Sequence, residues 1–158
     1  MIHSFRGRFE IKLDPKGRLS LPVAFRDSRA KENSRLVITN SRYQNNSCLH
    51  VYTINEWQDL EKKIGRLSSL NADVQAFQRF YIAGGQIVDL DSQGRILIPQ
   101  SLRKFARLNS EAILVGLGEK FEIWSQETWD QIYGNLSQSF ETTMASVAKL
   151  LEGTGGDG

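Results

Sequence analysis

Residue types that commonly carry chemistry are scarce in this chain of 158 residues. It has one cysteine, Cys48, which excludes an internal disulfide framework and a thiolate metal cluster. We expect Cys48 to be a small buried hydrophobe rather than a reactive thiol. The two histidines, His3 and His50, are far apart, and no ligand spacing accompanies either one. The sequence therefore predicts no metal site and no cofactor.

Long hydrophobic runs are also missing. No apolar segment of about 18 residues is available to span a bilayer, and the first residues, Met-Ile-His-Ser-Phe-Arg-Gly, lack the hydrophobic region of a signal peptide. We expect a cytoplasmic protein without membrane partners. A hydrophobic content of 40% allows one core, or two half-domains that share a core.

One twelve-residue pattern occurs twice. Residues 11–22, Ile-Lys-Leu-Asp-Pro-Lys-Gly-Arg-Leu-Ser-Leu-Pro, return 77 positions later as residues 88–99, Val-Asp-Leu-Asp-Ser-Gln-Gly-Arg-Ile-Leu-Ile-Pro. Five of the twelve positions are identical, and three more exchange one branched aliphatic residue for another. The correspondence extends to Arg26 with Arg103, Val51-Tyr52 with Ile123-Trp124, and Trp57 with Trp129. We infer an internal duplication with a pseudo-twofold relation inside one chain.

Alternating apolar and polar residues predict a strand, a tight turn and a second strand in each copy, at 9–13 and 19–23 in the first. Pro22 and Pro99 suit the first turn of a short helix that follows. In the first copy we expect Phe25 on the inner face of this helix and Arg26 outside. In the second copy we expect Leu102 on the inner face and Arg103 outside. A further strand pair is predicted in each half, at 36–39 with 49–52 and at 112–115 with 121–124.

Longer helices are predicted from apolar residues at helical spacing. Asn55 is a candidate N-cap for a helix carrying Trp57, Leu60, Ile64 and Leu67, and Ser125 begins its counterpart. A connecting helix is predicted before Gly84, and a last amphipathic helix before the glycine-rich residues 153–158, which we expect to be unstructured. The predicted divisions are a first repeat at 1–70, a connecting helix and linker at 71–84, a second repeat at 85–136, and a C-terminal helix and flexible tail at 137–158.

The net charge of +2 is unevenly distributed. Residues 1–35 hold nine cations against four anions, and residues 85–107 hold four cations against two anions. Positive charge therefore gathers around both copies of the pattern, where a polyanion would bind. An ordinary solvated surface is the alternative explanation.

The repeated turn is suited to recognising nucleic acid. In Asp14-Pro-Lys-Gly-Arg18 and Asp91-Ser-Gln-Gly-Arg95, the aspartate can accept backbone amides, and Gly17 or Gly94 can take a left-handed conformation. An arginine on a rigid turn can present its fork to guanine or to a phosphate. Arg18 and Arg95 are therefore the main DNA-binding candidates. Lys16, replaced by Gln93 in the second copy, is a further candidate, and Arg8, Lys12 and Arg26 are weaker ones. The alternative is that each Asp-Arg pair only holds its own turn.

The paired Asp-x-x-Gly-Arg turns, the N-terminal Phe-Arg-Gly and the linker Arg66-Leu-Ser-Ser-Leu-Asn71 resemble the MraZ family of bacterial transcriptional regulators, in the AbrB-like superfamily. The resemblance covers residues 4 to about 135. It implies a duplicated swapped-hairpin β-barrel, mostly β with flanking helices. It also implies a ring of roughly eight or more subunits and repression of a cell-division and cell-wall operon through short repeats in promoter DNA, at the nucleoid. Family residues carry over to Asp14, Arg18, Asp91 and Arg95.

Two other classes of function, an enzyme and an interaction protein, compete with DNA binding. Paired aspartates occur in aspartic proteases, but here each aspartate has an arginine four residues later that keeps it ionised, and neither copy reads Asp-Thr-Gly or Asp-Ser-Gly. No phosphate-binding loop is present either, so no enzyme is expected. A ring-forming interaction protein with purely structural turns remains the alternative.

Overall fold

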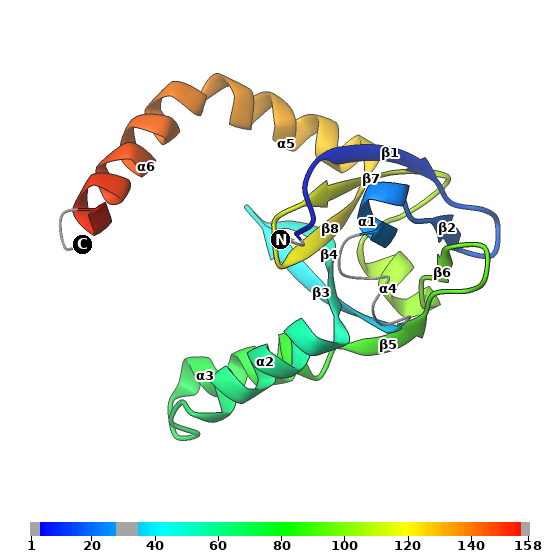
Figure 1. Cartoon of the computed structure of the whole chain (residues 1–158), viewed down its shortest axis with the longest axis horizontal. Helices are drawn as coiled ribbons and strands as arrows, with labels where there is room; N and C mark the ends of the chain where they lie inside the picture. The colour runs from blue at the N-terminus through cyan, green and yellow to red at the C-terminus, as the bar shows by residue number, and fades with distance from the viewer. Residues whose placement is uncertain (1–3, 28–34, 156–158) are drawn as a thin grey trace. The chain divides into compact units, whose positions relative to one another are not determined.

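The computed structural model describes residues 4–27 and 35–155. The chain divides into two compact units, Met1–Gln126 and Glu127–Gly158. The first unit is mostly antiparallel β-structure with flanking helices (Figure 1), as the sequence predicts. Its strands are β1 (Arg8–Lys12), β2 (Arg18–Ser20), β3 (Arg35–Tyr43), β4 (Asn46–Thr53), β5 (Gln86–Asp89), β6 (Arg95–Leu97), β7 (Glu111–Gly116) and β8 (Lys120–Ser125).

The strands form one large and one small sheet. Six strands follow the order β1-β7-β8-β4-β3-β5, and β2 pairs with β6 separately. Apart from the β3–β4 and β7–β8 hairpins, every pairing joins the first half of the chain to the second. Within the described residues β1 and β5 lie at opposite edges, so the predicted closed barrel is not formed.

Each strand pairing between the halves has an equivalent in which the corresponding strands of the two halves change places. Leu19 faces Ile96 at the centre of the β2–β6 pair, and Arg18 and Arg95 face Leu97 and Ser20 on either side of it. In the large sheet β4 pairs with β8, while β1 pairs with β7 and β5 with β3. The register thus places corresponding positions of the two copies in symmetric environments.

The main core lies between one face of the large sheet and the short helices α1 (Val23–Asp27) and α4 (Gln100–Phe105). These helices follow Pro22 and Pro99 as predicted, and Phe25 and Leu102 are buried. Phe5, Phe25 and Phe121 pack together with ring centroids 4.8–5.1 Å apart. Burying three aromatic rings in one cluster is a major source of stability. The Phe-Arg-Gly segment therefore contributes Phe5 to the core.

The opposite face of the large sheet, called here the outer face, is covered by helices in the middle of the chain. They are α2 (Ile54–Gly65), α3 (Ala72–Phe77) and the π-helix η2 (Gln78–Ile82). Trp57 and Tyr81 pack against Val37 and Tyr52 of the sheet. The predicted N-cap Asn55 is wrong, because the Thr53 hydroxyl at the end of β4 accepts the Glu56 amide at 3.2 Å. Leu67 lies past the end of α2 and is exposed.

The second unit contains α6 (Phe140–Gly155) and, apart from its first residue, α5 (Gln126–Gln138). Trp129 and Ile132 of α5 are buried, whereas large apolar side chains of α6 are exposed. The expectation of an unstructured segment from Gly153 was wrong for its first residues, since α6 continues through Gly155. The Thr154 hydroxyl there donates to the carbonyls of Leu150 and Leu151. Residues 156–158 lie outside the described residues. Across the described ranges, no helix is long and apolar enough to cross a membrane.

Candidate nucleic-acid interface

The first Asp-x-x-Gly-Arg turn is held by its own aspartate. Asp14 Oδ1 accepts the backbone amides of Lys16 and Arg18, each at 2.9 Å, and Asp14 Oδ2 accepts Arg18 Nε at 2.6 Å. The backbone closes the turn as well, because the Gly17 amide donates to the Asp14 carbonyl at 2.9 Å. The backbone amide of Arg18 is the largest influence on the Asp14 carboxyl. With the Arg18 side chain and the Lys16 amide, it lowers the pKa to about 2.

The second turn repeats the same bonds. Asp91 Oδ1 accepts the amides of Gln93 and Arg95, both at 2.9 Å, and Asp91 Oδ2 accepts Arg95 Nε at 3.0 Å. The Arg95 amide is again the largest cause of a lowered carboxyl pKa at Asp91. Two segments 77 positions apart in the sequence therefore build the same local structure.

The glycine of each turn packs against an arginine side chain from the short helix of the other copy. Gly17 and Gly94 have φ angles of +90° and +75°, which side chains of L-amino acids rarely adopt. A Cβ at Gly17 would meet the Arg103 side chain of α4, and one at Gly94 would meet Arg26 of α1. The outward orientation predicted for these arginines was wrong. Arg103 Nε donates to the Ile98 carbonyl at 2.9 Å, and Arg26 Nε is buried with no acceptor among the described residues.

The β2–β6 register brings the two candidate arginines to one face. Leu19 and Ile96 are buried, so the alternate residues Arg18 and Arg95 point to the other side. They are diagonal neighbours, for which Cα atoms lie roughly 7–8 Å apart. Their side chains are 35% and 30% exposed. Each Nε is bound to its own aspartate, and in the described part of the chain no acceptor engages the two terminal nitrogens of either guanidinium.

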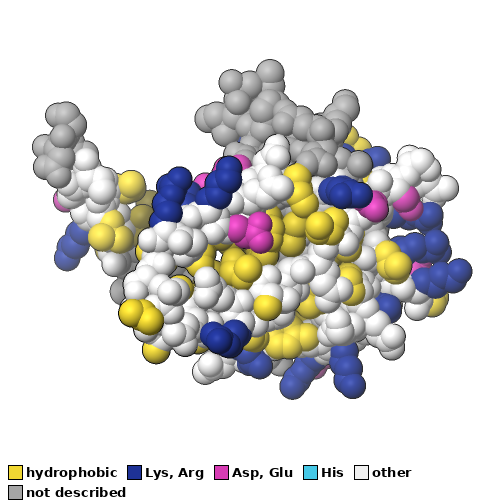
Figure 2. Space-filling model, turned by 90° about the horizontal axis from the view of Figure 1, so that it is seen from below, with side chains coloured by type: hydrophobic (Ala, Val, Ile, Leu, Met, Phe, Trp, Pro, Cys, Tyr) yellow, Lys and Arg dark blue, Asp and Glu magenta, His cyan; other side chains and the backbone are white. Residues whose placement is uncertain are grey.

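The other candidate cations, Lys16, Arg8 and Lys12, lie in two places. Lys16 is exposed in the first turn, where its counterpart in the second turn is Gln93. Arg8 and Lys12 are exposed on the edge strand β1. Figure 2 shows Lys and Arg side chains gathered at its right-hand end, the end at which Figure 1 places the two turns, with acidic side chains beside them. Basic groups and the two turns therefore share one end of the first unit.

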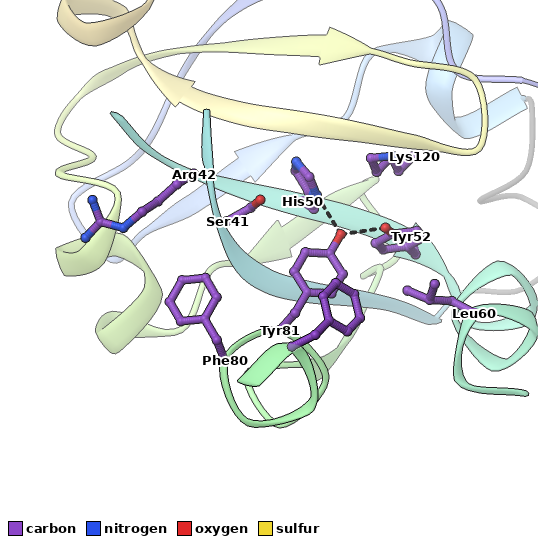
Figure 3. A pocket seen from close by; sticks show the side chains of 9 residues that line it. Ser41, Arg42, His50, Tyr52, Leu60, Phe80, Tyr81 and Lys120 are labelled. Atoms are coloured by element: carbon purple, nitrogen blue, oxygen red, sulfur yellow. Dashed lines mark hydrogen bonds between the residues drawn. The ribbon is translucent and has the colours of Figure 1, made fainter. Parts of the chain in front are cut away.

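A second polar site, which sequence reasoning missed, lies on the outer face. His50 Nδ1 is 2.6 Å from the Tyr81 hydroxyl, which is 2.5 Å from the Tyr52 hydroxyl (Figure 3). His50 Nε2 is 3.0 Å from Glu122 Oε2. Burial raises the pKa of Tyr81 and of Cys48, and Cys48 is buried as expected. Cys48 and His50 were visible in the sequence at a spacing of two, but only the strand register supplies Glu122.

Comparison with known proteins identifies the family. The family model described as "MraZ protein, putative antitoxin-like" matches residues 4–80 and 81–150. A relative from Desulforamulus reducens, "Transcriptional regulator MraZ", is 37% identical over 147 residues, covering 93% of this chain and 99% of the relative. The chain belongs to the MraZ family. The resemblance seen in the sequence is confirmed, and the family match extends beyond residue 135 to residue 150.

The MraZ family consists of transcriptional regulators rather than enzymes. Each of the two ranges of this chain that match the family model contains one turn: Asp14–Arg18 in the first and Asp91–Arg95 in the second. Among solved structures, the solution structure of PHS018 from Pyrococcus horikoshii covers 78% of this chain and 88% of its own, at 13% identity and a TM-score of 0.36. At this identity and TM-score, the similarity says nothing about the fold or the function of this MraZ family member.

Proposed function

We propose that this protein regulates transcription by binding double-stranded promoter DNA through its two Asp-x-x-Gly-Arg turns. In this proposal it acts in the cytoplasm at the nucleoid, as a repressor of the cell-division and cell-wall gene cluster, and recognises short promoter repeats. Family membership supports the regulatory role, and the placement of Arg18 and Arg95 supports the mode of binding. The single observation that carries the proposal is that both arginines lie on one outward face of the β2–β6 pair.

The ion pair within each turn prepares the arginine for recognition. With Nε bound to the aspartate, the guanidinium plane is restricted, so less side-chain entropy is lost when its terminal nitrogens bind an acceptor. The two terminal nitrogens can then bond guanine N7 and O6, or a phosphate. The aspartate itself would repel DNA, but the arginine neutralises it.

The two turns are expected to contact DNA unequally. Lys16 adds a cation to the first turn, where the second has the neutral Gln93. Arg8 and Lys12 are exposed on β1 in the first copy, and their counterparts in β5 and before it carry no cation. We expect the first copy to supply more phosphate contacts, while Arg18 and Arg95 both reach base edges.

Oligomerisation is part of the proposed mechanism. A few phosphate contacts give only weak non-specific affinity, on the order of 10⁻⁴ to 10⁻⁶ M at physiological salt. A ring of roughly eight or more subunits would present the turns repeatedly and raise avidity by about 10² to 10⁴. In the same proposal, the halves 1–70 and 85–136 are AbrB-like repeats in a swapped-hairpin arrangement, joined by 71–84 and followed by 137–158.

Fluorescence anisotropy on DNA from upstream of the protein's own gene, against scrambled DNA, tests the proposal over a salt series. We expect the wild type to prefer its own DNA and to weaken steeply with salt, with log K falling by about 0.9 per phosphate contact for each unit of log salt. The double variant Arg18→Ala/Arg95→Ala should lose at least about ten-fold in preference, because each good base contact contributes roughly 1–3 kcal/mol.

The matched control is Lys62→Ala/Lys63→Ala, which removes the same charge from the exposed last turn of α2. This control should retain the preference for own DNA. If Arg18→Ala/Arg95→Ala keeps its oligomer size and binds like the wild type, the turns are structural. The protein would then be a ring-forming interaction protein, an alternative favoured by the bonds from each arginine to its own turn.

A further inference from the structure

The outer face of the large sheet holds three potential metal ligands where the two halves of the chain meet. Cys48 and His50 are two residues apart in β4, so their side chains leave the same face. His50 lies directly opposite Glu122 of β8. One donor atom from each of the three residues lies within 4.8 Å of the donor atoms of the other two. The spacing of two brings Cys48 and His50 to one face, and the register adds Glu122.

We propose that Cys48, His50 and Glu122 bind a divalent transition metal, with Zn²⁺ the favoured ion. A thiolate, an imidazole and a carboxylate are all established zinc ligands, whereas Mg²⁺ and Ca²⁺ prefer sets made only of oxygen atoms. Three protein ligands leave one tetrahedral position for a water or a small ligand. On its other side, His50 lines a cavity of about 420 Å³ together with Tyr81 and Tyr52.

The metal would replace a proton between two groups that already contact each other. His50 Nε2 and Glu122 Oε2 are 3.0 Å apart and joined by a hydrogen bond. Two ligands of a tetrahedral Zn²⁺ with bonds of about 2.0–2.1 Å lie about 3.3 Å apart, so a small widening admits the ion. Cys48 binds as a thiolate and releases its proton to solvent.

The surrounding hydrogen bonds are those that orient metal ligands. The Trp124 indole Nε1 donates to Glu122 Oε1 at 2.9 Å, leaving Oε2 for the ion. With Nε2 on the metal, His50 Nδ1 carries the ring proton and donates to the Tyr81 hydroxyl, which donates to Tyr52 in turn. Partners of this kind fix the histidine tautomer and the carboxylate orientation in metal sites. Figure 3 shows the hydrogen bonds that connect His50 to Tyr81 and Tyr81 to Tyr52.

Charge balance favours a divalent ion at this position. The Cys48 thiolate and the Glu122 carboxylate together offset the two positive charges of Zn²⁺. The site is then neutral overall. Because β4 and β8 come from different copies of the repeat, the ion would connect the two halves of the first unit. A bound metal should therefore stabilise the folded chain.

Metal titrations of the full-length protein, purified in the presence of a chelator and then freed of it, test the proposal. We expect Co²⁺ to produce a thiolate-to-metal charge-transfer band and tetrahedral ligand-field bands, and Zn²⁺ to remove both. Zn²⁺ affinity is measured by competition with a chromophoric chelator. Cys48→Ala should abolish the charge-transfer band, and Cys48→Ala and Glu122→Gln should each weaken Zn²⁺ binding by about ten-fold or more.

Two further variants separate ligation from general effects. Ser41→Ala changes the residue paired with Cys48 on β3 and should bind Zn²⁺ like the wild type. Tyr81→Phe keeps the ring but removes the hydroxyl next to His50, and should weaken binding by roughly ten-fold. The absence of a thiolate band in the wild type would overturn the proposal without reference to any variant. Unchanged Zn²⁺ affinity in Glu122→Gln, a substitution of the same shape, would also overturn it.

Discussion

At the scale of single residues, the two aspartates carry most of the local structure of the turns. Asp14 binds two backbone amides and the Arg18 Nε with its two oxygens, and Asp91 does the same for its own turn. Only the ionised carboxylate can accept all these bonds, since protonation turns one oxygen into a donor. The conformation that presents each arginine is therefore coupled to the charge of an aspartate.

This coupling predicts a specific acid sensitivity. The pKa of Asp14 is about 2 in the folded protein, below its ordinary value of 3.8. A depressed pKa contributes stability that is fully present above pH 3.8 and is lost as the pH falls to about 2. We expect Asp14→Asn to be less stable than the wild type above this window and the difference to shrink within it. Urea denaturation at a series of pH values measures the difference.

Asp59→Asn, on the exposed surface of α2, is the matched control for the change of charge. It should leave the free energy of unfolding at neutral pH within about 0.5 kcal/mol of the wild type. A stability difference between Asp14→Asn and the wild type that stays constant down to the lowest pH would contradict the role given to the Asp14 carboxylate.

At the scale of elements, η2 is held on the sheet by side chains of β3. The Thr39 hydroxyl donates to the Tyr81 carbonyl at 2.6 Å, and Asn40 Nδ2 donates to the Phe80 carbonyl at 3.0 Å. A Cβ at Gly84 would collide with Thr39 and Asn40, so glycine lets the chain after η2 approach β3 closely. These contacts place Tyr81 beside His50. π-Helical turns often occur at functional sites, and this one shapes the cavity.

Thr39→Val tests this attachment. Valine keeps the shape of the fully buried Thr39 but leaves the Tyr81 carbonyl without its donor. We expect the free energy of unfolding to fall by about 1–3 kcal/mol, and amide hydrogen exchange at residues 81–83 to become faster. Thr142→Val, on the exposed surface of α6, should change stability by less than about 0.5 kcal/mol. Equal effects of the two substitutions would rule out a specific role for the Thr39 bond.

At the scale of the whole molecule, α6 has an apolar face that the described residues leave exposed. Phe140, Met144, Val147 and Leu151 follow helical spacing and are 46–66% exposed. Such a continuous apolar stripe is typical of a surface that packs against another helix. A second copy of the chain is the partner expected in a homo-oligomer, as the sequence predicts.

Val147→Glu/Leu151→Glu places two charges on this face and should reduce the oligomer to smaller species. Mass photometry of the full-length protein measures the size directly. Thr142→Glu/Ala145→Glu adds the same charge on the opposite side of the helix and should keep the size of the wild type. If both double variants assemble normally, α6 is not an interface between copies of the chain.

Much of the fold could be predicted because the information was local or repeated. The bonds from Asp14 to its own turn, the short helix after Pro22 and the apolar alternation around Leu19 are encoded by residues close together in the sequence. The N-cap was misassigned because Thr53 and Asn55 are both good caps, and the end of β4 decides between them. The packing of Arg26 and Arg103 against the turns was missed because it depends on a glycine in the other copy.

The sequence by itself determined the two turns, their glycines and the family of the protein, because each turn closes over five residues and both copies repeat the pattern. Only the tertiary structure decided which side chains meet. Antiparallel pairing of β2 with β6 and of β4 with β8 places Arg18 near Arg95 and His50 opposite Glu122. A shift of one residue in either register would move these side chains to the other face, and a single sequence does not encode the register in any short segment.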